Sequence, residues 1–148
     1  MSGLSRVFND LVRLEIAVWD AVDARLKSEF SLPLTRYEPM SVMGRVPDCR
    51  VYDIATELGI TPGGVSKLVD RIEASGYCRR LPNPSDRRSS LVELTPEGER
   101  VLALATDALE DELERWFGVL PERTLRQFGA TLARLRTASH GPAAEAIA

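Results

Sequence analysis

The chain has 148 residues, of which 44% are hydrophobic and 28% are charged, and its formal net charge is −3. This composition is typical of one globular domain with its own hydrophobic core. No apolar run reaches the ~18 residues that a membrane-spanning helix needs. Asp10 and Glu15 interrupt the apolar residues at the N-terminus, which argues against a secretory signal. A cytoplasmic location is therefore the default prediction.

The N-terminal region predicts a long amphipathic helix from Ser5 to about Phe30. Apolar residues recur there every three or four positions, at Val7, Leu11, Leu14, Val18, Val22 and Leu26. The stretch 31–34 breaks the pattern. Residues 35–38 then have the sequence of a capping box, with Thr35 at the N-cap of a helix that ends near Pro47.

From Val51 to Gly76 the pattern predicts two short helices joined by a tight turn. Each helix repeats apolar residues at i, i+3, i+4 and i+7: Val51, Ile54, Ala55, Leu58 in the first and Val65, Leu68, Val69, Ile72 in the second. Gly59 ends the first helix, and Thr61-Pro62 begins the second with a hydroxyl N-cap and proline at N1. Gly76 stands where a C′ glycine ends the second helix. Such a pair is a helix-turn-helix, whose second helix is shaped to enter a DNA major groove.

A short hairpin with a basic loop is expected next. Residues 77–81 and 90–94 have the composition of strands, and the turn-rich loop between them ends in Arg87 and Arg88. Prolines in the loop stop either strand from extending, so the loop should project. Arginines at a projecting tip suit a narrow, electronegative minor groove. A helix-turn-helix followed by such a hairpin is a winged helix.

Charge is distributed unevenly along the chain. Residues 61–95 hold six basic and four acidic groups, a net charge of +2, whereas residues 1–60 carry −2 and residues 96–148 carry −3. Phosphate binding depends on the local patch, so an acidic chain can still bind DNA. The excess of basic over acidic groups in residues 61–95 is modest, which argues against tight nonspecific binding to DNA.

The C-terminal third again predicts helices. Thr95-Pro96 begins a long one whose apolar stripe runs to Leu120, Pro121 ends or interrupts it, and Leu125 to Leu135 mark another. The outer helices are longer than a small winged helix needs, so we expect them to pair with a second copy. A two-fold dimer would place two recognition helices about one DNA turn apart on a palindrome. A monomeric helical cap is the alternative.

These predictions combine into one domain over residues 1–148. The fold class is mainly α with a small antiparallel β-wing. Residues 1–34 and 100–138 are the predicted dimerisation helices, residues 35–99 the DNA-binding lobe and residues 139–148 a flexible tail.

The segment from Leu34 to Arg100 resembles the multiple antibiotic resistance regulator (MarR) family of bacterial transcription factors. The matching residues are Leu34-Thr35, Val69-Asp70-Arg71-Ile72-Glu73, Gly76-Tyr77, Asp86-Arg87-Arg88 and Leu94-Thr95-Pro96-Glu97-Gly98. The resemblance implies a homodimer joined through both terminal helical regions, a palindromic operator and frequently release by a small ligand or an oxidant. Repression is favoured because blocking a promoter needs no further surface, but activation stays open.

Nine residues are predicted to bind DNA: Thr61, Gly63, Gly64, Ser66, Lys67, Arg71, Asp86, Arg87 and Arg88. The helix N-terminus at Thr61 offers backbone N–H groups to phosphate, and Ser66 and Lys67 are expected at base edges and phosphates. Asp86 is expected to hold the Arg88 guanidinium through bidentate hydrogen bonds.

At three positions the sequence leaves more than one structural role open. Gly64 either lets DNA approach or packs beneath the wing. Arg79 and Arg80 alternate across a strand, so one of them faces DNA, and the pattern does not decide which.

An effector site is predicted on the family's habit of binding ligands between the dimerisation helices and the DNA-binding lobe. Its candidates are Trp19, Arg36, Tyr37, Met40 and Met43. Ordinary core packing is the favoured alternative for these aromatic residues and methionines.

No cofactor, metal site or catalytic residue is predicted. The chain has no nucleotide-binding glycine loop and no metal-ligand cluster, and its single histidine, His140, lies in the tail. Cys78 is expected to be a buried structural thiol, whereas Cys49 is expected near the surface. The alternative functions are therefore a redox-responsive regulator that uses Cys49, and a winged-helix interaction module that does not bind DNA.

Overall fold

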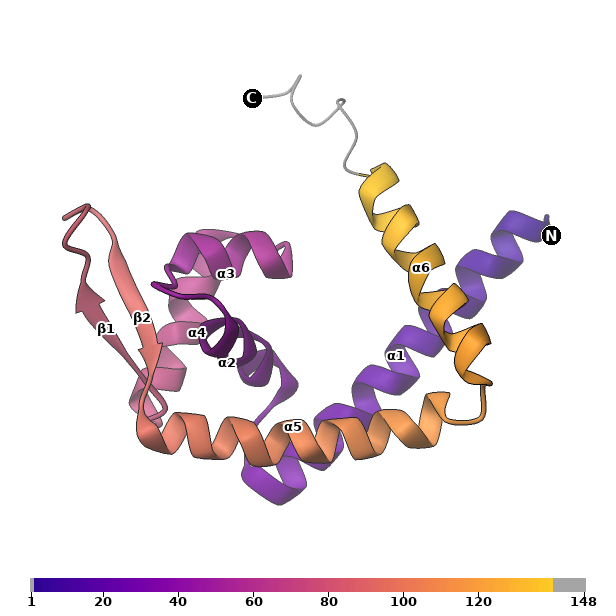
Figure 1. The fold of residues 1–148 in the computed structure, drawn as a ribbon, viewed down its shortest axis with the longest axis horizontal. Helices are drawn as coiled ribbons and strands as arrows, with labels where there is room; N and C mark the ends of the chain where they lie inside the picture. Colours follow the sequence, from indigo (N-terminus) through magenta and orange to yellow (C-terminus); the bar gives the residue numbers. More distant parts are fainter. Residues whose placement is uncertain (1, 140–148) are drawn as a thin grey trace. The chain divides into compact units, whose positions relative to one another are not determined.

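The computed structural model describes residues 2–139, which divide into two compact units at residues 112 and 113. In chain order the elements are α1 (Gly3–Phe30), α2 (Leu34–Arg45), α3 (Val51–Leu58), α4 (Pro62–Ala74), β1 (Cys78–Pro82), β2 (Ser90–Leu94), α5 (Pro96–Phe117) and α6 (Glu122–Ser139) (Figure 1). This confirms the predicted fold class, mainly helical with one antiparallel hairpin. No helix among the described residues is long and apolar enough to cross a membrane. Apart from Ser139, the predicted tail lies outside the described residues.

Helix α1 buries only its C-terminal half. Val22 and Leu26 are 3% and 0% exposed, as the apolar stripe predicts. The same stripe is exposed towards the N-terminus, where Val7 and Leu11 are 64% and 43% exposed. The N-terminal half of α1 therefore presents an apolar surface that its own chain leaves open within residues 1–112.

Helix α2 begins earlier than the sequence predicts. Its first residue is Leu34 and its N-cap is Pro33, so the predicted capping box with Thr35 at the N-cap is wrong. The Leu34 N–H donates a hydrogen bond to Asp23 Oδ1 of α1 at 2.8 Å. A carboxylate from another helix thus satisfies one of the free N–H groups of the first turn, and no local pattern contains that contact.

Helices α3 and α4 form the predicted helix-turn-helix. Gly59 ends α3 with φ +65°, and the Gly64 N–H donates to Thr61 Oγ1 at 3.1 Å, which confirms the N-cap. Gly76 ends α4 with φ +80° and donates to Glu73 O at 2.9 Å, while Tyr77 N–H donates to Ile72 O at 3.2 Å. These two bonds are a Schellman motif. The core between α2, α3, α4 and the hairpin contains Met40, Val42, Ile54, Val65, Val69, Ile72 and Val92.

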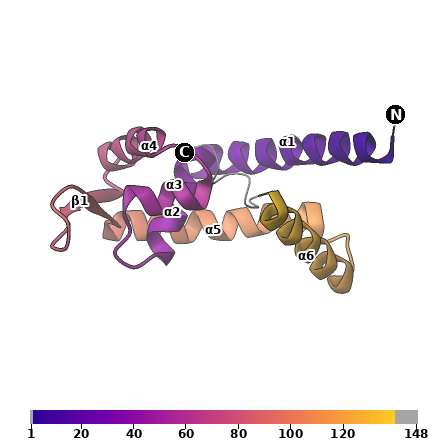
Figure 2. The same cartoon turned by 90° about the horizontal axis from the view of Figure 1, so that it is seen from above.

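The hairpin pairs Cys78 with Leu94 at its base and Pro82 with Ser90 near its tip. It is tied to the segment before α3, because Val92 N–H donates to Cys49 O at 2.7 Å and Arg50 forms a bridge with Leu91. Figures 1 and 2 show the hairpin beside α2, α3 and α4, with its loop projecting past them. The wing is thus attached through β2 to the segment that leads into the helix-turn-helix.

Helix α5 starts against the base of the wing. The Thr95 hydroxyl accepts the Gly98 N–H at 3.1 Å and donates to Gly76 O at 2.6 Å. The helix ends at Phe117, so the predicted stripe stops short of Leu120, which lies between α5 and α6.

Replacing Gly98 by alanine is expected to destabilise the protein by about 3 kcal/mol, because overpacking a tight core costs roughly this much. A Cβ at position 98 would stand 1.9 Å from Tyr77 O, so α5 and the base of the wing would have to separate. Thermal unfolding followed by circular dichroism measures the effect. Gly129→Ala is the control, because a Cβ there meets nothing within 4 Å; it should be neutral or slightly stabilising. Equal melting temperatures for the Gly98→Ala variant and the parent would contradict this close approach.

Candidate nucleic-acid interface

Helix α4 presents one polar side to solvent. Gly63, Lys67 and Arg71 are four residues apart and all are exposed, so they lie along one face of the helix. A Cβ added to Gly63 would meet nothing within 4 Å, which leaves the backbone of the first turn open to a partner. A Cβ added to Gly64 would meet only the Thr61 hydroxyl, at 3.2 Å. The alternative that Gly64 packs beneath the wing is therefore wrong.

The wing loop is shaped by its own side chains. Asn83 Oδ1 accepts the Ser85 N–H at 3.0 Å, and Asp86 Oδ1 accepts the backbone N–H of Arg88 at 2.9 Å. The predicted bidentate pair between the Asp86 carboxylate and the Arg88 guanidinium is wrong, since no such ion pair occurs in the described part of the chain. The reason is local, because a carboxylate two residues before an N–H group readily closes an Asx turn. Asp86 sets the loop backbone, and the Arg88 guanidinium remains available to other partners.

Four cations of this region have no ion-pair partner among residues 2–139. They are Lys67 and Arg71 on α4 and Arg87 and Arg88 on the wing loop, and all four are exposed. Other basic residues of the same lobe, such as Arg45, Arg50, Arg79 and Arg80, form ion pairs within the chain. Cations without an internal partner exchange their counterions for phosphate at the lowest cost.

Arg79 and Arg80 lie on opposite sides of β1. Arg79 Nε contacts Glu93 Oε1 on the neighbouring strand at 2.5 Å. Arg80 turns to the recognition helix, where its Nη2 lies 2.7 Å from Asp70 Oδ1 and donates to Ser66 O at 3.3 Å, and its Nη1 lies 3.2 Å from Glu73 Oε1. Of the two arginines, Arg80 is the one beside α4, and it fastens the wing to that helix.

A concave surface of about 470 Å³ separates the start of α4 from the wing. It brings together Ser66, Asp86 and Arg88, three residues predicted from sequence, and adds Arg50 and Tyr52, which were not predicted. Tyr52 is 65% exposed in the first turn of α3. Its position outside the apolar face of that helix was the signal that could have identified it. Arg50 sits at the N-cap of α3, where hydrogen bonding to Asp53 raises the pKa of its guanidinium.

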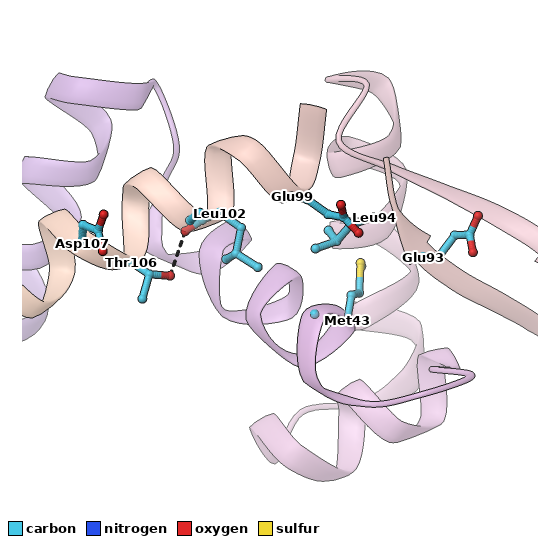
Figure 3. Close-up of a pocket in the computed structure, with 9 residues that line it drawn as sticks. Met43, Glu93, Leu94, Glu99, Leu102, Thr106 and Asp107 are labelled. Atoms are coloured by element: carbon cyan, nitrogen blue, oxygen red, sulfur yellow. Dashed lines mark hydrogen bonds between the residues drawn. The ribbon is translucent and has the colours of Figure 1, made fainter. Parts of the chain in front are cut away.

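The structure does not bring the five predicted effector residues into one cavity. Tyr37 and Met40 are core residues, 6% and 0% exposed, and Tyr37 OH lies 3.1 Å from Thr106 Oγ1. Met43 lines a depression of about 650 Å³ between α2, β2 and α5, where Glu93, Glu99 and Asp107 supply carboxylates (Figure 3). Trp19 lines a separate cavity, and Arg36 is half-buried and lines neither. Core packing, the favoured alternative, describes Tyr37 and Met40.

Both cysteines are buried and free of disulfides. Cys49 is 2% exposed, so the prediction that it lies near the surface is wrong. Burial raises the pKa of both thiols to about 11, with a smaller contribution from Asp53 at Cys49 and from Glu73 at Cys78. Since the thiolate is the reactive form, a redox-responsive regulator that uses Cys49 lacks its reactive group in this structure. No cluster of metal-ligating side chains occurs among the described residues.

Alkylation should report this burial directly. At pH 8 a thiol with a pKa of about 11 is ionised about a hundredfold less than one at its ordinary 9.0. We therefore expect iodoacetamide to modify either cysteine of the folded protein at least a hundredfold more slowly than in urea, as followed by mass spectrometry. Rapid modification of Cys49 in the folded protein would restore the redox alternative.

Sequence and structure comparisons agree on one family. Residues 32–90 match the sequence profile of the MarR family. The multiple antibiotic resistance protein MarR of Salmonella typhimurium is 26% identical over 107 residues, which cover 68% of this chain and 74% of that protein. Over residues 32–90, from α2 to the start of β2, the chain is similar to the MarR family.

Solved structures share the fold of this chain. Sco3205 from Streptomyces coelicolor, a MarR family transcriptional regulator in complex with DNA, superposes with a TM-score of 0.88 at 22% identity, over 96% of this chain and 95% of that one. CouR from Rhodococcus jostii RHA1, bound to p-coumaroyl-CoA, superposes with a TM-score of 0.77 at 26% identity, over 84% and 87% of the two chains. The matched profile spans α2 to the first residue of β2, so α1, α5 and α6 lie outside it.

Proposed function

We propose that this protein is a MarR-family transcriptional regulator that binds a palindromic DNA operator as a homodimer. The observation that carries the proposal is the set of four exposed cations without internal partners. Lys67 and Arg71 stand on the helix, and Arg87 and Arg88 on the loop, that a winged helix directs towards DNA. The rest of the chain has a net negative charge, so DNA binding is limited to the surface formed by α4 and the wing loop.

The proposed contacts divide by element. The first turn of α4, with Thr61 and the open backbone at Gly63 and Gly64, meets phosphate through its N–H groups. Ser66 and Lys67 reach base edges and the adjoining phosphates in the major groove. Arg87 and Arg88 meet the minor groove or its phosphates. The concave surface with Arg50 and Tyr52 follows the DNA backbone between the groove that α4 enters and the groove that the wing loop contacts.

The homodimer is proposed from the open apolar half of α1. Leu4, Val7, Phe8 and Ile16 are 84%, 64%, 65% and 51% exposed, more than an isolated surface helix usually leaves open. We assign residues 1–34 and 100–138 to dimerisation and residues 35–99 to the DNA-binding lobe.

Repression is the proposed mode, since an occupied operator blocks a promoter without a further surface. A small molecule that favours a DNA-incompetent arrangement of the lobes would release the operator, in the way that any ligand shifts a two-state equilibrium. CouR, solved with p-coumaroyl-CoA, is a relative in which a ligand is seen. This role places the protein in the bacterial cytoplasm and makes it a regulator rather than an enzyme.

A genomic-fragment binding selection with the purified protein at moderate salt tests the proposal. An inverted repeat whose half-site centres lie about one helical turn apart is the expected result. The affinity for that repeat should fall steeply as salt rises, because phosphate contacts release counterions. Recovery of no sequence above background, together with binding that salt does not weaken, would favour the protein-interaction module instead.

A further inference from the structure

The end of the recognition helix α4 and the start of α5 meet at one threonine. The Thr95 hydroxyl donates to Gly76 O at 2.6 Å and accepts the Gly98 N–H at 3.1 Å. The Thr95 N–H donates to Tyr77 O at 3.0 Å. Gly76 follows the C-cap of α4, and Gly98 lies in the first turn of α5. Thr95 therefore binds both helices, and we call Gly76, Tyr77, Thr95 and Gly98 the Thr95 joint.

The joint holds the two backbones in direct contact. A Cβ added to Gly98 would stand 1.9 Å from Tyr77 O and 2.8 Å from the carbonyl carbon of Tyr77. The strands that follow and precede the joint are paired with each other from Cys78 and Leu94 onwards, so the base of the wing closes over it. A rotation of α4 relative to α5 would break both hydroxyl bonds and disturb this close packing.

The second hydrogen bond of the Thr95 hydroxyl is what distinguishes it from an ordinary N-cap. A capping bond alone, like the one that Thr61 accepts from Gly64, fixes where a helix begins. The bond from Thr95 to Gly76 O joins groups 19 residues apart. It therefore fixes where α5 begins relative to the end of α4.

Beyond the joint, side chains connect α5 to α1 and α2. Arg25 Nη2 of α1 lies 3.2 Å from Asp111 Oδ2 of α5. Tyr37 OH of α2 lies 3.1 Å from Thr106 Oγ1 of α5. Helix α1 also carries the open apolar half that we assign to the dimer. A continuous series of contacts thus runs from the proposed dimer surface through α5 to the end of the recognition helix.

We propose that Thr95 is a positioning residue that sets the half-site spacing the dimer reads, an inference that rests on the proposed function. In a two-fold dimer, the separation and direction of the two recognition helices must match the two half-sites. One additional base pair moves a half-site by about 3.4 Å and turns it about the DNA axis by about 34°. A rigid joint does not follow this displacement, whereas a joint without the hydroxyl bonds bends towards it.

Two substitutions separate the hydroxyl from the shape of the side chain. Thr95→Val keeps the branched shape and removes both hydroxyl bonds, and Thr95→Ser keeps both bonds. Affinities are measured for the selected inverted repeat and for versions one base pair longer or shorter. The parent and Thr95→Ser should lose about a hundredfold for a change of one base pair, and Thr95→Val only about tenfold. Affinity for an isolated half-site should be equal in all three, because α4 and the wing loop are unchanged.

Ile54→Val is the matched control for lost stability. Ile54 is fully buried in α3, away from the joint, and its truncation costs about as much stability as the loss of a helix cap. This variant should keep the spacing preference of the parent. A drop in melting temperature by itself therefore does not mimic the effect expected of Thr95→Val.

A measurement without DNA tests the joint itself. Spin labels at Lys67→Cys on α4 and Glu110→Cys on α5, both exposed positions, report the distribution of distances between the two helices. Both natural cysteines are 2% exposed and should stay unlabelled. Dilution with unlabelled protein removes signals between two copies. The distribution should be narrow in the parent and in Thr95→Ser, and at least twice as wide in Thr95→Val.

The inference is overturned if Thr95→Val keeps the hundredfold spacing penalty, or if its distance distribution matches that of the parent. Equal losses at the half-site and at the inverted repeat would give Thr95 a purely structural role. A parent that selects no inverted repeat would refute the proposed function and the spacing role together. The distance measurement would then still decide whether Thr95 fixes α4 against α5.

Discussion

Replacing Arg87 and Arg88 together by alanine should weaken operator binding by about a hundredfold at physiological salt. Each charge-assisted contact to a phosphate or base edge contributes more than a neutral hydrogen bond, and two such contacts multiply to roughly this factor. Neither guanidinium has a partner among the described residues, and both are exposed, so their loss leaves nothing unpaired in the protein. Fluorescence anisotropy with a labelled operator, measured over a series of salt concentrations, gives the affinity and its salt dependence.

The salt series distinguishes the loss of direct contacts between the wing and DNA from a general effect of reduced positive charge. The slope of log affinity against log salt should become shallower by about two, because two phosphates would no longer be neutralised by an arginine. Arg100→Ala removes an exposed cation of α5 that is paired with Glu97, and it should change the affinity little. Size-exclusion chromatography and circular dichroism should match the parent for both variants. Operator binding as tight as that of the parent would show that the wing does not contact DNA.

Substituting glutamate for Phe8 and Leu11 should abolish the dimer and, with it, most of the operator affinity. These side chains are 65% and 43% exposed on the open half of α1, so a carboxylate costs nothing in the free chain. At a dimer interface the same carboxylates would be buried without partners, which costs several kcal/mol. A monomer binds one half-site, so the affinity for the palindrome should fall by at least a hundredfold.

Analytical ultracentrifugation across protein concentration measures the association directly. Ser28→Glu adds one carboxylate at an exposed polar position near the other end of α1, outside the open apolar half, and it should leave the dimer unchanged. Half-site binding by the Phe8→Glu/Leu11→Glu variant should persist, because its helix-turn-helix is untouched. A variant that remains dimeric would assign the interface elsewhere, and a parent that is monomeric would favour the helical cap.

The two elements proposed to meet DNA are held together before DNA arrives. Arg80 of β1 contacts Asp70 and Glu73 of α4 and donates to Ser66 O. The charges on the recognition helix and on the wing therefore belong to one packed lobe, so little order has to be gained when both elements engage DNA.

The sequence by itself determined the local elements of the lobe and its resemblance to the MarR family. Gly59, Thr61 and Gly76 mark where α3 ends and where α4 begins and ends, and the structure has each of them in the predicted role. Helix caps and helical repeats depend on residues that are close together in the chain, so they can be recognised from the sequence alone. The hairpin was predicted within one residue of its observed strands for the same reason. The identities of the nine predicted DNA contacts remain predictions.

Other features were decided only by the tertiary structure, because they depend on groups that are far apart in the chain. Asp23 caps α2 from α1, Arg80 pairs with α4 rather than facing solvent, and Cys49 is buried beneath the wing segment to which its carbonyl is bonded. Trp19, Glu38 and Leu68 line one cavity only because α1, α2 and α4 converge there. Burial and ion pairing depend on which elements pack together. A periodic pattern shows which face of a helix is buried, but it does not show which element covers that face.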